Sequence, residues 1–409
     1  QLEHQVAHIL TEQENHGWYF DESLARELES ALRREYEETC SVLRNRHPFV
    51  SGPLFTPKRD NRSKGYVAGA TFTKLKDLNP TSRDHISWIL TTHYGWKASL
   101  MTSTGKPVVN ETVLKEIGTD ISLQFLKLLD LTKQLGMISE GVNAWQKLVT
   151  TSSRIHHHCS VATSTFRCAH RKPNLAQVPS DERFRQLFKA TPGKVLVGAD
   201  LSGIELRMLA HYLARYDKGR YTEILLTDDI HAVNAKRIGI TRREVKTVTY
   251  AFLYGAGDRK IGVSVDKLLS DEQAAKKGRE IRKAYVDAIP GLKELLEAVK
   301  KASERGYVLG LDKRRILVDK PHKALNYLLQ GSSAILAKRW MLLAHGHLPK
   351  SAHQLAFVHD ELQYECDPCD IGYMRGCLES TAVQAGEFYN MRCPVAAESQ
   401  SGANWAEVH

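Results

Sequence analysis

The chain has 409 residues, of which 42% are hydrophobic and 25% are charged, and this composition excludes a disordered chain. The length exceeds what one ordinary core accommodates, so we expect two or three subdomains. The net charge of +10 suits a nucleic-acid partner as well as it suits a merely basic surface. No apolar run approaches the ~20 residues that a transmembrane helix needs. Seven scattered cysteines form no dense disulfide framework, which indicates a reducing compartment.

The first third of the chain is mainly helical by its pattern. Residues 1–45 carry apolar side chains at helical spacing among many charges, and helical segments resume from Ser82 to about Leu148. Between them, residues 47–79 are rich in Pro, Gly and basic residues, which predicts an irregular and partly exposed insertion.

The rest of the chain mixes helices with a few short strands. A loop-rich stretch from 156 to 180 precedes "KVLVGAD", a short buried strand that ends at Asp200, and a helix follows directly. Residues 220–300 and 323–348 are mostly helical, and 354–365 is strand-like with a possible turn at His359 and Asp360. We therefore expect an α+β fold in which helices surround a small sheet.

Two carboxylates stand at the ends of predicted strands. Strands of one sheet can bring Asp200 and Asp360 within a few ångströms, and such a pair repels unless a cation lies between. Carboxylate oxygens favour Mg²⁺, and two such ions can hold the attacking and leaving oxygens of a phosphoryl transfer. The alternative is that each Asp only caps a turn or a helix.

Two neighbouring acids have their own alternatives. Glu361 follows Asp360 directly, and strand alternation would point their side chains to opposite faces. Ser202 and Glu205 have capping-box spacing, so Glu205 could simply satisfy the start of its helix.

The segment 241–257, "TRREVKTVTYAFLYGAG", predicts a helix with a functional face. A capping box of Thr241 and Glu244 begins it, and the glycines that follow end it. Cations match triphosphate oxygens and rings offer a stacking surface, although a solvated basic turn before a buried aromatic turn would look the same. No Walker phosphate-loop pattern is present. The functional face consists of four residues at a spacing of four, two cations followed by two aromatic rings: Arg242, Lys246, Tyr250 and Tyr254.

Taken together, these motifs make the chain similar to family A DNA polymerases, the DNA polymerase I superfamily. "DLSGIELR" and "VHDE" resemble the two palm motifs, and "RREVKTVTYAFLYGAG" resembles the fingers helix. "TFRCAHRKPNLAQVP" and "ALNYLLQGSSA" resemble two further family segments, in the family's order. "NPTSRDHI", "DIHAVN" and "ANWAEVH" fit the bacteriophage branch whose best-known member recruits host thioredoxin.

The resemblance implies a right-hand polymerase fold. We expect a thumb over residues 1–155 with a short insertion at about 47–79, and a first palm segment over 156–218. Fingers over 219–335 and a second palm segment over 336–409 complete this division. The chain begins where the thumb is expected to begin, so no proofreading exonuclease is expected in it.

The resemblance also implies metal ligands and a reaction. Asp200, Asp360 and the carbonyl of Leu201 would hold two Mg²⁺ ions, for which Mn²⁺ is expected to substitute. A primer 3′ oxygen would attack the α-phosphorus of a deoxynucleoside triphosphate under the direction of a DNA template.

Nucleotide-binding roles follow from the same resemblance. Arg242, Lys246 and His231 would contact the triphosphate, and Lys246 would protonate the departing pyrophosphate. Tyr250 would pack on the deoxyribose. Glu205 would be the steric gate against a 2′-hydroxyl, and Tyr254 would border the nascent base pair.

Primer–template contacts complete the set of implied roles. Arg167 and Gln330 would donate to minor-groove acceptors, which all base pairs share, and Asn326 would support them. His359 would touch the primer end, and Glu361 would be a supporting charge near the metals.

Two rival functions remain open from the sequence. A single-subunit RNA polymerase shares this plan, but it would not need a bulky gate at Glu205. A non-catalytic DNA-binding module would not need Asp200, Asp360 and Lys246. A DNA polymerase of this kind would be cytoplasmic, in the host cytoplasm if it is phage-encoded.

Several features depart from the family pattern or resemble other sites. Phe166 stands where the family has Gly, which bears on the placement of Arg167. The short insertion argues against dependence on thioredoxin or another processivity factor, and its "PKRDNRSK" run suits DNA phosphates, with a solvated loop as the alternative. "HHHC" at 156–159 cannot surround one tetrahedral ion with four consecutive residues, and "CDPC" at 366–369 lacks a matching pair, so neither predicts a metal site.

Overall fold

The computed structural model describes residues 1–266 and 269–409, and the chain divides into two compact units. The larger unit contains Gln1–Asp21 and Leu148–His409, and the smaller contains Glu22–Lys147. The smaller unit lies within the predicted thumb range, but residues 1–21 and 148–155 of that range group with the larger unit. Among the described residues, no helix is both long enough and apolar enough to cross a membrane.

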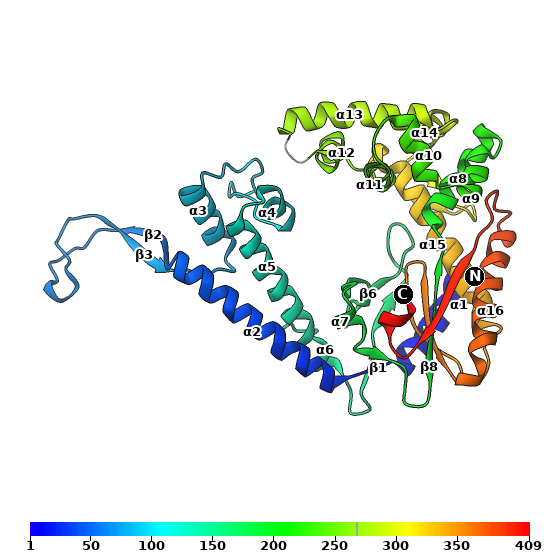
Figure 1. Cartoon of the computed structure of the whole chain (residues 1–409), viewed down its shortest axis with the longest axis horizontal. Helices are drawn as coiled ribbons and strands as arrows, with labels where there is room; N and C mark the ends of the chain where they lie inside the picture. The colour runs from blue at the N-terminus through cyan, green and yellow to red at the C-terminus, as the bar shows by residue number, and fades with distance from the viewer. Residues whose placement is uncertain (267–268) are drawn as a thin grey trace. The chain divides into compact units, whose positions relative to one another are not determined.

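The smaller unit is built on two long helices, α2 (Glu22–Arg46) and α5 (Asp120–Leu135), which pack against each other (Figure 1). Their apolar residues recur at helical spacing and form one core, which includes Leu43, Phe125 and Leu128. The remaining helices are α3 (Arg83–Tyr94), α4 (Glu111–Ile117), α6 (Trp145–Leu148), which crosses the unit boundary, and a π-helical turn at Gly136–Glu140.

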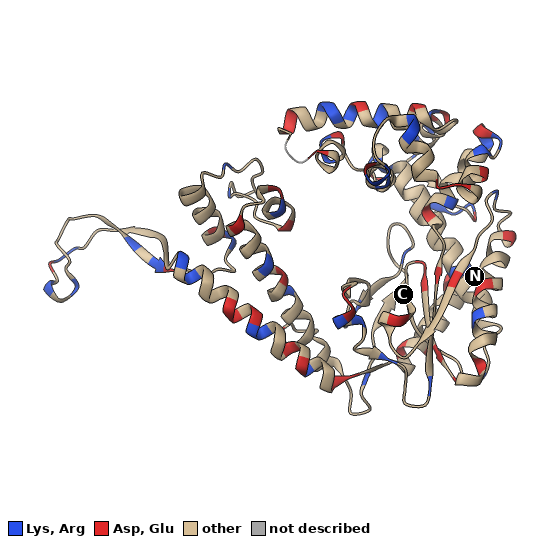
Figure 2. Cartoon of the chain, in the orientation of Figure 1, with Lys and Arg blue, Asp and Glu red and all other residues tan. Residues whose placement is uncertain are grey.

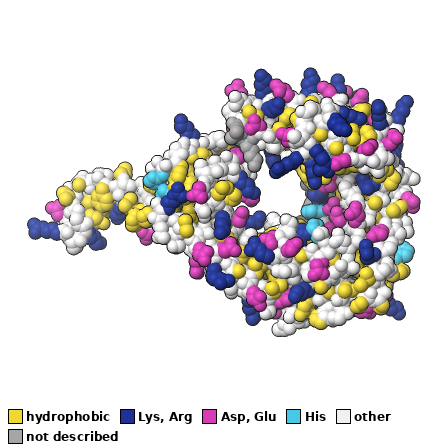
Figure 3. All heavy atoms as spheres, in the orientation of Figure 1, with side chains coloured by type: hydrophobic (Ala, Val, Ile, Leu, Met, Phe, Trp, Pro, Cys, Tyr) yellow, Lys and Arg dark blue, Asp and Glu magenta, His cyan; other side chains and the backbone are white. Residues whose placement is uncertain are grey.

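The predicted irregular insertion is instead a β-hairpin. Strands β2 (Phe49–Phe55) and β3 (Phe72–Asp77) pair antiparallel, and a 3₁₀ turn at Arg62–Lys64 lies in the loop between them. Several apolar side chains of these strands face solvent: Leu54 is 74% exposed and Leu75 66% exposed. Figure 2 marks basic residues at the tip of the hairpin, and Figure 3 shows basic side chains there and hydrophobic ones along the strands.

A four-stranded antiparallel sheet forms the centre of the larger unit. Its strand order is β11 (His353–Val358), β12 (Glu361–Cys366), β8 (Val195–Leu201), β13 (Ala397–Gly402). Alternate residues such as Val197, Leu362 and Tyr364 join a core with helix α16 (Ile371–Phe388), which packs on β8 and β13 (Figure 1). The side chains that alternate with them face the other side of the sheet.

The first helix belongs to the larger unit, and the helical pattern expected over residues 1–45 is interrupted at residues 17–21. Helix α1 (Leu2–His16) ends at Gly17, and β1 (Trp18–Phe20) separates it from α2. Val6 and Ile9 join the core of the larger unit, and Glu3 accepts a 2.6 Å ion-pair hydrogen bond from the fully buried Lys338. These contacts, which no local pattern encodes, group α1 with the sheet.

A helical layer stands beside the sheet. Helix α15 is buried on nearly all sides, because it is apolar around its whole circumference and packs against α1, α8, α14 and α16. The two short strands after α14 were not predicted. The elements are α8 (Ile204–Asp217), α9 (Arg220–Thr227), α10 (Ile230–Ile238), α11 (Arg242–Leu253), α12 (Asp258–Val265), α13 (Asp271–Ala288), α14 (Leu292–Ser303), β9 (Tyr307–Leu309), β10 (Arg315–Leu317) and α15 (Ala324–His345).

Short elements complete the larger unit. Strands β4 and β7 flank β1, and β5 pairs with β6 in the stretch expected to be a loop. Their bounds are β4 (Arg154–Ile155), β5 (His158–Ser160), β6 (Ala169–Arg171), α7 (Glu182–Arg185), β7 (Phe188–Lys189), and 3₁₀ turns at Leu175–Gln177, Pro321–Lys323, Pro368–Asp370 and Trp405–Val408.

Candidate active site

The two predicted metal-binding aspartates lie at one end of the sheet. Asp200 is near the end of β8, and Asp360 is in the two-residue turn between β11 and β12. The backbone N–H of Leu201 donates to the Asp360 carbonyl at 3.0 Å, which ties the turn to β8. His359, the other turn residue, has φ +62°, a left-handed conformation that makes the reversal tight.

Burial and then neighbouring acids raise the pKa of both aspartates. Loss of hydration, followed by the negative charge of Asp360, raises the pKa of Asp200 to about 7, although part of its side chain faces solvent. Loss of hydration, followed by the charge of Glu205, raises the pKa of Asp360 to about 6. Like charges that repel in this way favour a cation between them. Carboxylates and a backbone carbonyl are the oxygen ligands that suit Mg²⁺.

Glu361 has a different environment from Asp360. It is the residue paired with Asp200 across the sheet, and its carboxylate accepts hydrogen bonds from Trp405 at 2.6 Å and Gln363 at 2.7 Å. Its other oxygen lies 2.9 Å from His409 Nδ1. Burial by itself would raise the pKa of Glu361, but hydrogen bonds from these three partners lower it.

The alternation expected between Asp360 and Glu361 does not apply, because Asp360 lies in a turn and not in a strand. The sequence also did not reveal that Trp405 and His409 hold Glu361; the terminal "ANWAEVH" was noted only as part of the resemblance. Gly198 makes this approach possible, because a Cβ there would lie 2.4 Å from the Val408 carbonyl oxygen.

Glu205 does not cap its helix, so the capping-box alternative is wrong. The N-cap of α8 is Gly203, and the Ser202 hydroxyl donates instead to Glu398 at 3.3 Å. Glu205 accepts hydrogen bonds from Arg167 at 3.0 Å and from the Tyr254 hydroxyl at 3.1 Å. The structure thus brings together three residues that are far apart in sequence.

Phe166 adopts the conformation that a glycine would favour. Its φ is +60°, and its ring lies against the guanidinium of Arg314, 4.9 Å from ring centroid to guanidinium carbon. The chain therefore keeps a left-handed residue directly before Arg167, and the ring contact offsets part of the conformational cost.

The capping box at the start of α11 is confirmed. Thr241 and Glu244 exchange both hydrogen bonds, and Gly255, with φ +70°, follows the end of the helix. The Asn326 amide donates to the Leu253 carbonyl at 2.8 Å, so this side chain closes the carboxyl end of α11. Gln330 lies half-buried one turn farther along α15.

The cationic and aromatic residues Arg242, Lys246, Tyr250 and Tyr254 recur every four residues from the start of α11, so they follow one side of the helix. Lys246 is exposed there, and Arg242 pairs with Asp229 at 2.5 Å, a partner that the sequence did not indicate. The His231 ring lies 6.2 Å from the Tyr250 ring, centroid to centroid. The pKa of Tyr250 is raised by burial and then by the charges of Glu205 and Asp360, which places its hydroxyl in the field of the acids.

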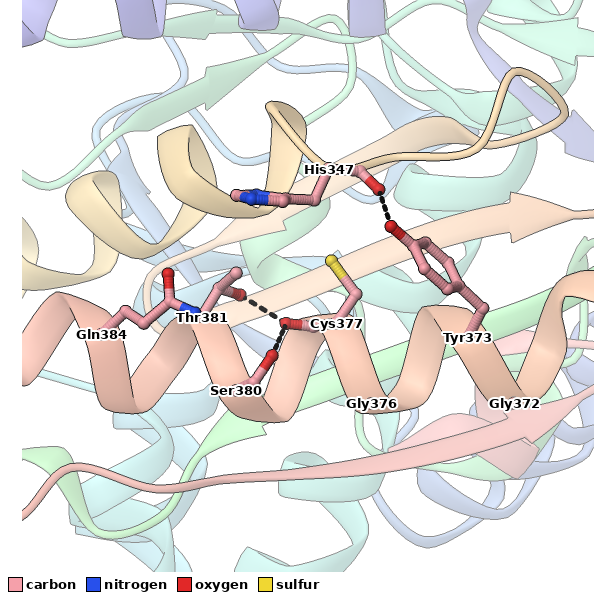
Figure 4. A pocket seen from close by; sticks show the side chains of 8 residues that line it. All are labelled: His347, Gly372, Tyr373, Gly376, Cys377, Ser380, Thr381 and Gln384. Atoms are coloured by element: carbon pink, nitrogen blue, oxygen red, sulfur yellow. Dashed lines mark hydrogen bonds between the residues drawn. The ribbon is translucent and has the colours of Figure 1, made fainter.

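A cavity of about 320 Å³ between the end of α15 and α16 lies apart from these residues (Figure 4). Its hydroxyl groups bond to the protein itself: Tyr373 donates to the His347 carbonyl, and Ser380 and Thr381 donate to the Cys377 carbonyl. This cavity contains none of the predicted site residues.

Comparisons with known proteins agree with the fold and with these motifs. The polymerase domain of Pol1 from M. smegmatis, solved in complex with DNA primer–template and dNTP, superposes with a TM-score of 0.80. The match covers 99% of this chain and 70% of that one at 21% sequence identity, and it shows that the fold is the α+β fold of a polymerase domain.

Sequence comparison identifies the family. The model of DNA polymerase family A matches residues 61–407, and the chain belongs to this family. The DNA-directed DNA polymerases of Enterobacteria phage T3 and Escherichia phage T7 are each 32% identical over all of this chain and 70% of their own length. DNA polymerase I of Rhizobium leguminosarum is 27% identical over 95% of this chain and 40% of its own length. The chain is a template-directed DNA polymerase, and the two rival functions are not favoured. Polymerases of this family generally use divalent metal ions.

Proposed function

We propose that this enzyme extends the 3′ end of a DNA primer with deoxynucleoside triphosphates, and that the acids between β8 and β12 are its reaction centre. The observation that carries the proposal is the convergence of Asp200 and Asp360, whose pKa values are both raised, first by burial and then by neighbouring carboxylates. Carboxylates that repel one another are suited to bind a cation between them.

Asp200, Asp360 and the carbonyl of Leu201 would hold two Mg²⁺ ions. When bound, such ions lower the charge on the attacking and leaving oxygens of a phosphoryl transfer. The primer 3′ oxygen forms a bond to the α-phosphorus, the bond from that phosphorus to the bridging oxygen breaks, and pyrophosphate leaves. The 3′-hydroxyl would lose its proton to solvent, and the exposed ammonium of Lys246 would give a proton to the pyrophosphate.

The cationic side of α11 would bind the triphosphate. Arg242, Lys246 and His231 supply donors for phosphate oxygens, and Arg242 would exchange Asp229 for phosphate. Tyr250, which lies half-buried beside His231, would pack on the deoxyribose.

The hydrogen-bonded group around Glu205 would select the sugar. Arg167 and Tyr254 hold the same oxygen of Glu205, so the carboxylate has little freedom to make room for a 2′-hydroxyl. Tyr254, which is partly exposed, would border the nascent base pair.

Primer–template contacts would come from neighbouring elements. Arg167 retains donors beyond its ion pair, and together with Gln330 it would reach minor-groove acceptors that all base pairs present. Asn326 would support Gln330 through its place on α15, His359 would touch the primer end, and Glu361 would support the metal site.

The finer organisation is also a proposal. Thumb, palm and fingers would follow the division expected from the sequence, except that α1 packs with the palm sheet. The basic tip of the β2–β3 hairpin would contact DNA phosphates. The exposed apolar residues of its strands would be the contact surface if a processivity factor such as thioredoxin binds.

Primer extension tests the proposal. Asp360→Ala should abolish extension while primer–template binding in a gel-shift assay persists, and Asp287→Ala, an exposed change on α13, should match the wild type. Comparable extension by Asp360→Ala and wild type would exclude the two-metal assignment. Glu205→Ala should retain extension with deoxynucleotides and incorporate ribonucleotides more readily.

A further inference from the structure

Three metal-binding side chains gather at the β5–β6 hairpin, away from the acids described above. One ligand atom from each of His157, Cys159 and His170 can be chosen so that all lie within 4.8 Å of one another. His157 immediately precedes β5 and stands two residues before Cys159, and antiparallel pairing sets His170 directly opposite Cys159. The sequence did not indicate this arrangement, in which only two alternate residues of the "HHHC" run come together and a further side chain comes from β6.

The three side chains are buried and carry unused donor or acceptor atoms. His157 is 0% exposed, His170 7% and Cys159 8%. Cys159 Sγ lies 3.3 Å from His170 Nδ1, whereas His157 Nδ1 and His170 Nε2 are buried without a hydrogen-bond partner among the described residues. The nitrogens near Cys159 are the other two: His170 Nδ1 lies 3.3 Å from its sulfur, and His157 Nε2 shares the Gln13 amide with that sulfur.

The side-chain amide of Gln13 contacts two of these three residues. Gln13 Nε2 donates to His157 Nε2 at 3.1 Å and to Cys159 Sγ at 3.5 Å. The orientation of this amide is set, because its oxygen accepts from Gln354 Nε2 at 2.8 Å, and the Gln354 oxygen accepts from Tyr364 at 2.9 Å. His157 Nε2 therefore presents a lone pair, and the positive end of the Gln13 amide lies where a cation would lie.

We propose that His157, Cys159 and His170 form a binding site for a transition metal ion of the zinc class, entered when the Gln13 amide swings aside. Two imidazoles and one thiolate are the ligand types that such ions prefer over the hard oxygen ligands of Mg²⁺. Zinc bond lengths of ~2.3 Å to sulfur and ~2.0 Å to nitrogen place neighbouring ligand atoms roughly 3.6 Å apart in a tetrahedron. The observed 3.3 Å between Sγ and Nδ1 is close to this, so small side-chain rotations suffice.

The protonation states fit a site that is loaded with loss of one proton. A neutral imidazole keeps a lone pair on one ring nitrogen, so His157 and His170 can each offer one ligand atom. The Cys159 thiol loses its proton to solvent as the metal–sulfur bond forms, with no change in oxidation state. The three residues leave one position of the tetrahedron open on the side of Gln13.

The site would act as a structural clamp. It would join the two strands of the β5–β6 hairpin next to α1, which packs on β5. The ring of His170 meets the ring of His359 edge-on, 6.4 Å between centroids, and His359 immediately precedes Asp360. A bound ion would thus hold in place one wall of the turn that carries the catalytic aspartate.

Metal binding to the full chain tests the inference. Chelator-treated wild-type protein in excess Mg²⁺, which occupies carboxylate sites, should bind one equivalent of Zn²⁺. X-ray absorption of the zinc-loaded wild type should show one sulfur at about 2.3 Å together with nitrogen at about 2.0 Å. A first shell of oxygen and nitrogen only, or no bound zinc, would overturn the proposal without any variant.

Variants then locate the ligand. Co²⁺ in place of Zn²⁺ should give a thiolate-to-cobalt charge-transfer band in the wild type, and Cys159→Ser should lose this band and bind at least tenfold more weakly. The matched controls are Cys168→Ser, a buried free thiol in the same core, and Cys369→Ser, an exposed one, and both should keep the band. Loss of the band in either control with its retention in Cys159→Ser would refute the assignment.

Discussion

Replacing Asp360 by Asn should make the folded protein more stable while it removes DNA synthesis. The pKa of Asp360 is raised to about 6 from a usual 3.8, first by loss of hydration and then by the charge of Glu205. A carboxyl whose pKa is higher in the folded state binds its proton more tightly there. The stability that this group contributes is therefore present below about pH 4 and is lost as the pH rises to about 6. Asn keeps the shape and carries no charge, so it avoids this loss.

The size of the effect follows from the pKa difference. About two pH units at about 1.4 kcal/mol each give an upper value of about 3 kcal/mol. Partial access of solvent screens the charge, so we expect a gain of about 1–3 kcal/mol at pH 8. The loss of repulsion on Asp200, whose own pKa is raised by Asp360, acts in the same direction.

Urea denaturation of wild type and Asp360→Asn in the presence of a chelator measures this gain. The variant should unfold at a higher urea concentration at pH 8, and the difference should shrink toward pH 4. Added Mg²⁺ should stabilise the wild type more than the variant, because it binds the folded acid pair. The reasoning is refuted if the variant is less stable at pH 8 or if the difference is independent of pH. Asp287→Asn, outside the acid cluster, should show no such dependence.

Three further predictions concern other parts of the larger unit. Phe166→Gly and Phe166→Ala both lose the ring, so the difference between their free energies of unfolding reports the conformational cost of the backbone at φ +60°. Urea denaturation should show the Gly variant more stable than the Ala variant by about 1 kcal/mol. Equal urea midpoints would mean that the backbone there is unstrained. Glu365 is buried and accepts hydrogen bonds from His16 and Thr191, which overcome the effect of burial and lower its pKa to about 2. Glu365→Gln should therefore cost about 3 kcal/mol at pH 7, measured in urea, and the gap should close as the pH falls from 4.5 toward 2; a gap that persists at pH 2 would contradict this. Tyr250→Phe should increase discrimination against dideoxynucleotides in a chain-termination assay, because a Tyr hydroxyl can replace the contact of a missing 3′-hydroxyl, and equal termination by both proteins would count against that role.

Elements whose signals are local could be predicted well. The capping box of α11 lies within four residues of sequence, and its two hydrogen bonds form as expected. The reversal at His359 and Asp360 is likewise encoded by adjacent residues between two apolar runs. The interruption of the first helix at Gly17 was missed, because the packing of β1 between β4 and β7 decides it and the pattern of residues 1–45 does not.

Partners across long sequence separations could not be predicted. Whether Ser202 and Glu205 form a cap or bind elsewhere depends on Arg167 and Tyr254, which local spacing does not bring near. Likewise Glu361 is held by Trp405 and His409, which reach it only because Gly198 leaves space in the sheet.

By itself, the sequence determined the family and the class of fold and indicated the residue types of the proposed reaction centre, because each motif is a short run whose meaning does not depend on distant residues. Only the tertiary structure decided which charges are neighbours. Register across the sheet places Glu361 opposite Asp200, and pairing of β5 with β6 places His170 opposite Cys159. Such contacts close long loops of chain, and they form only when the whole core forms, so no local pattern contains them.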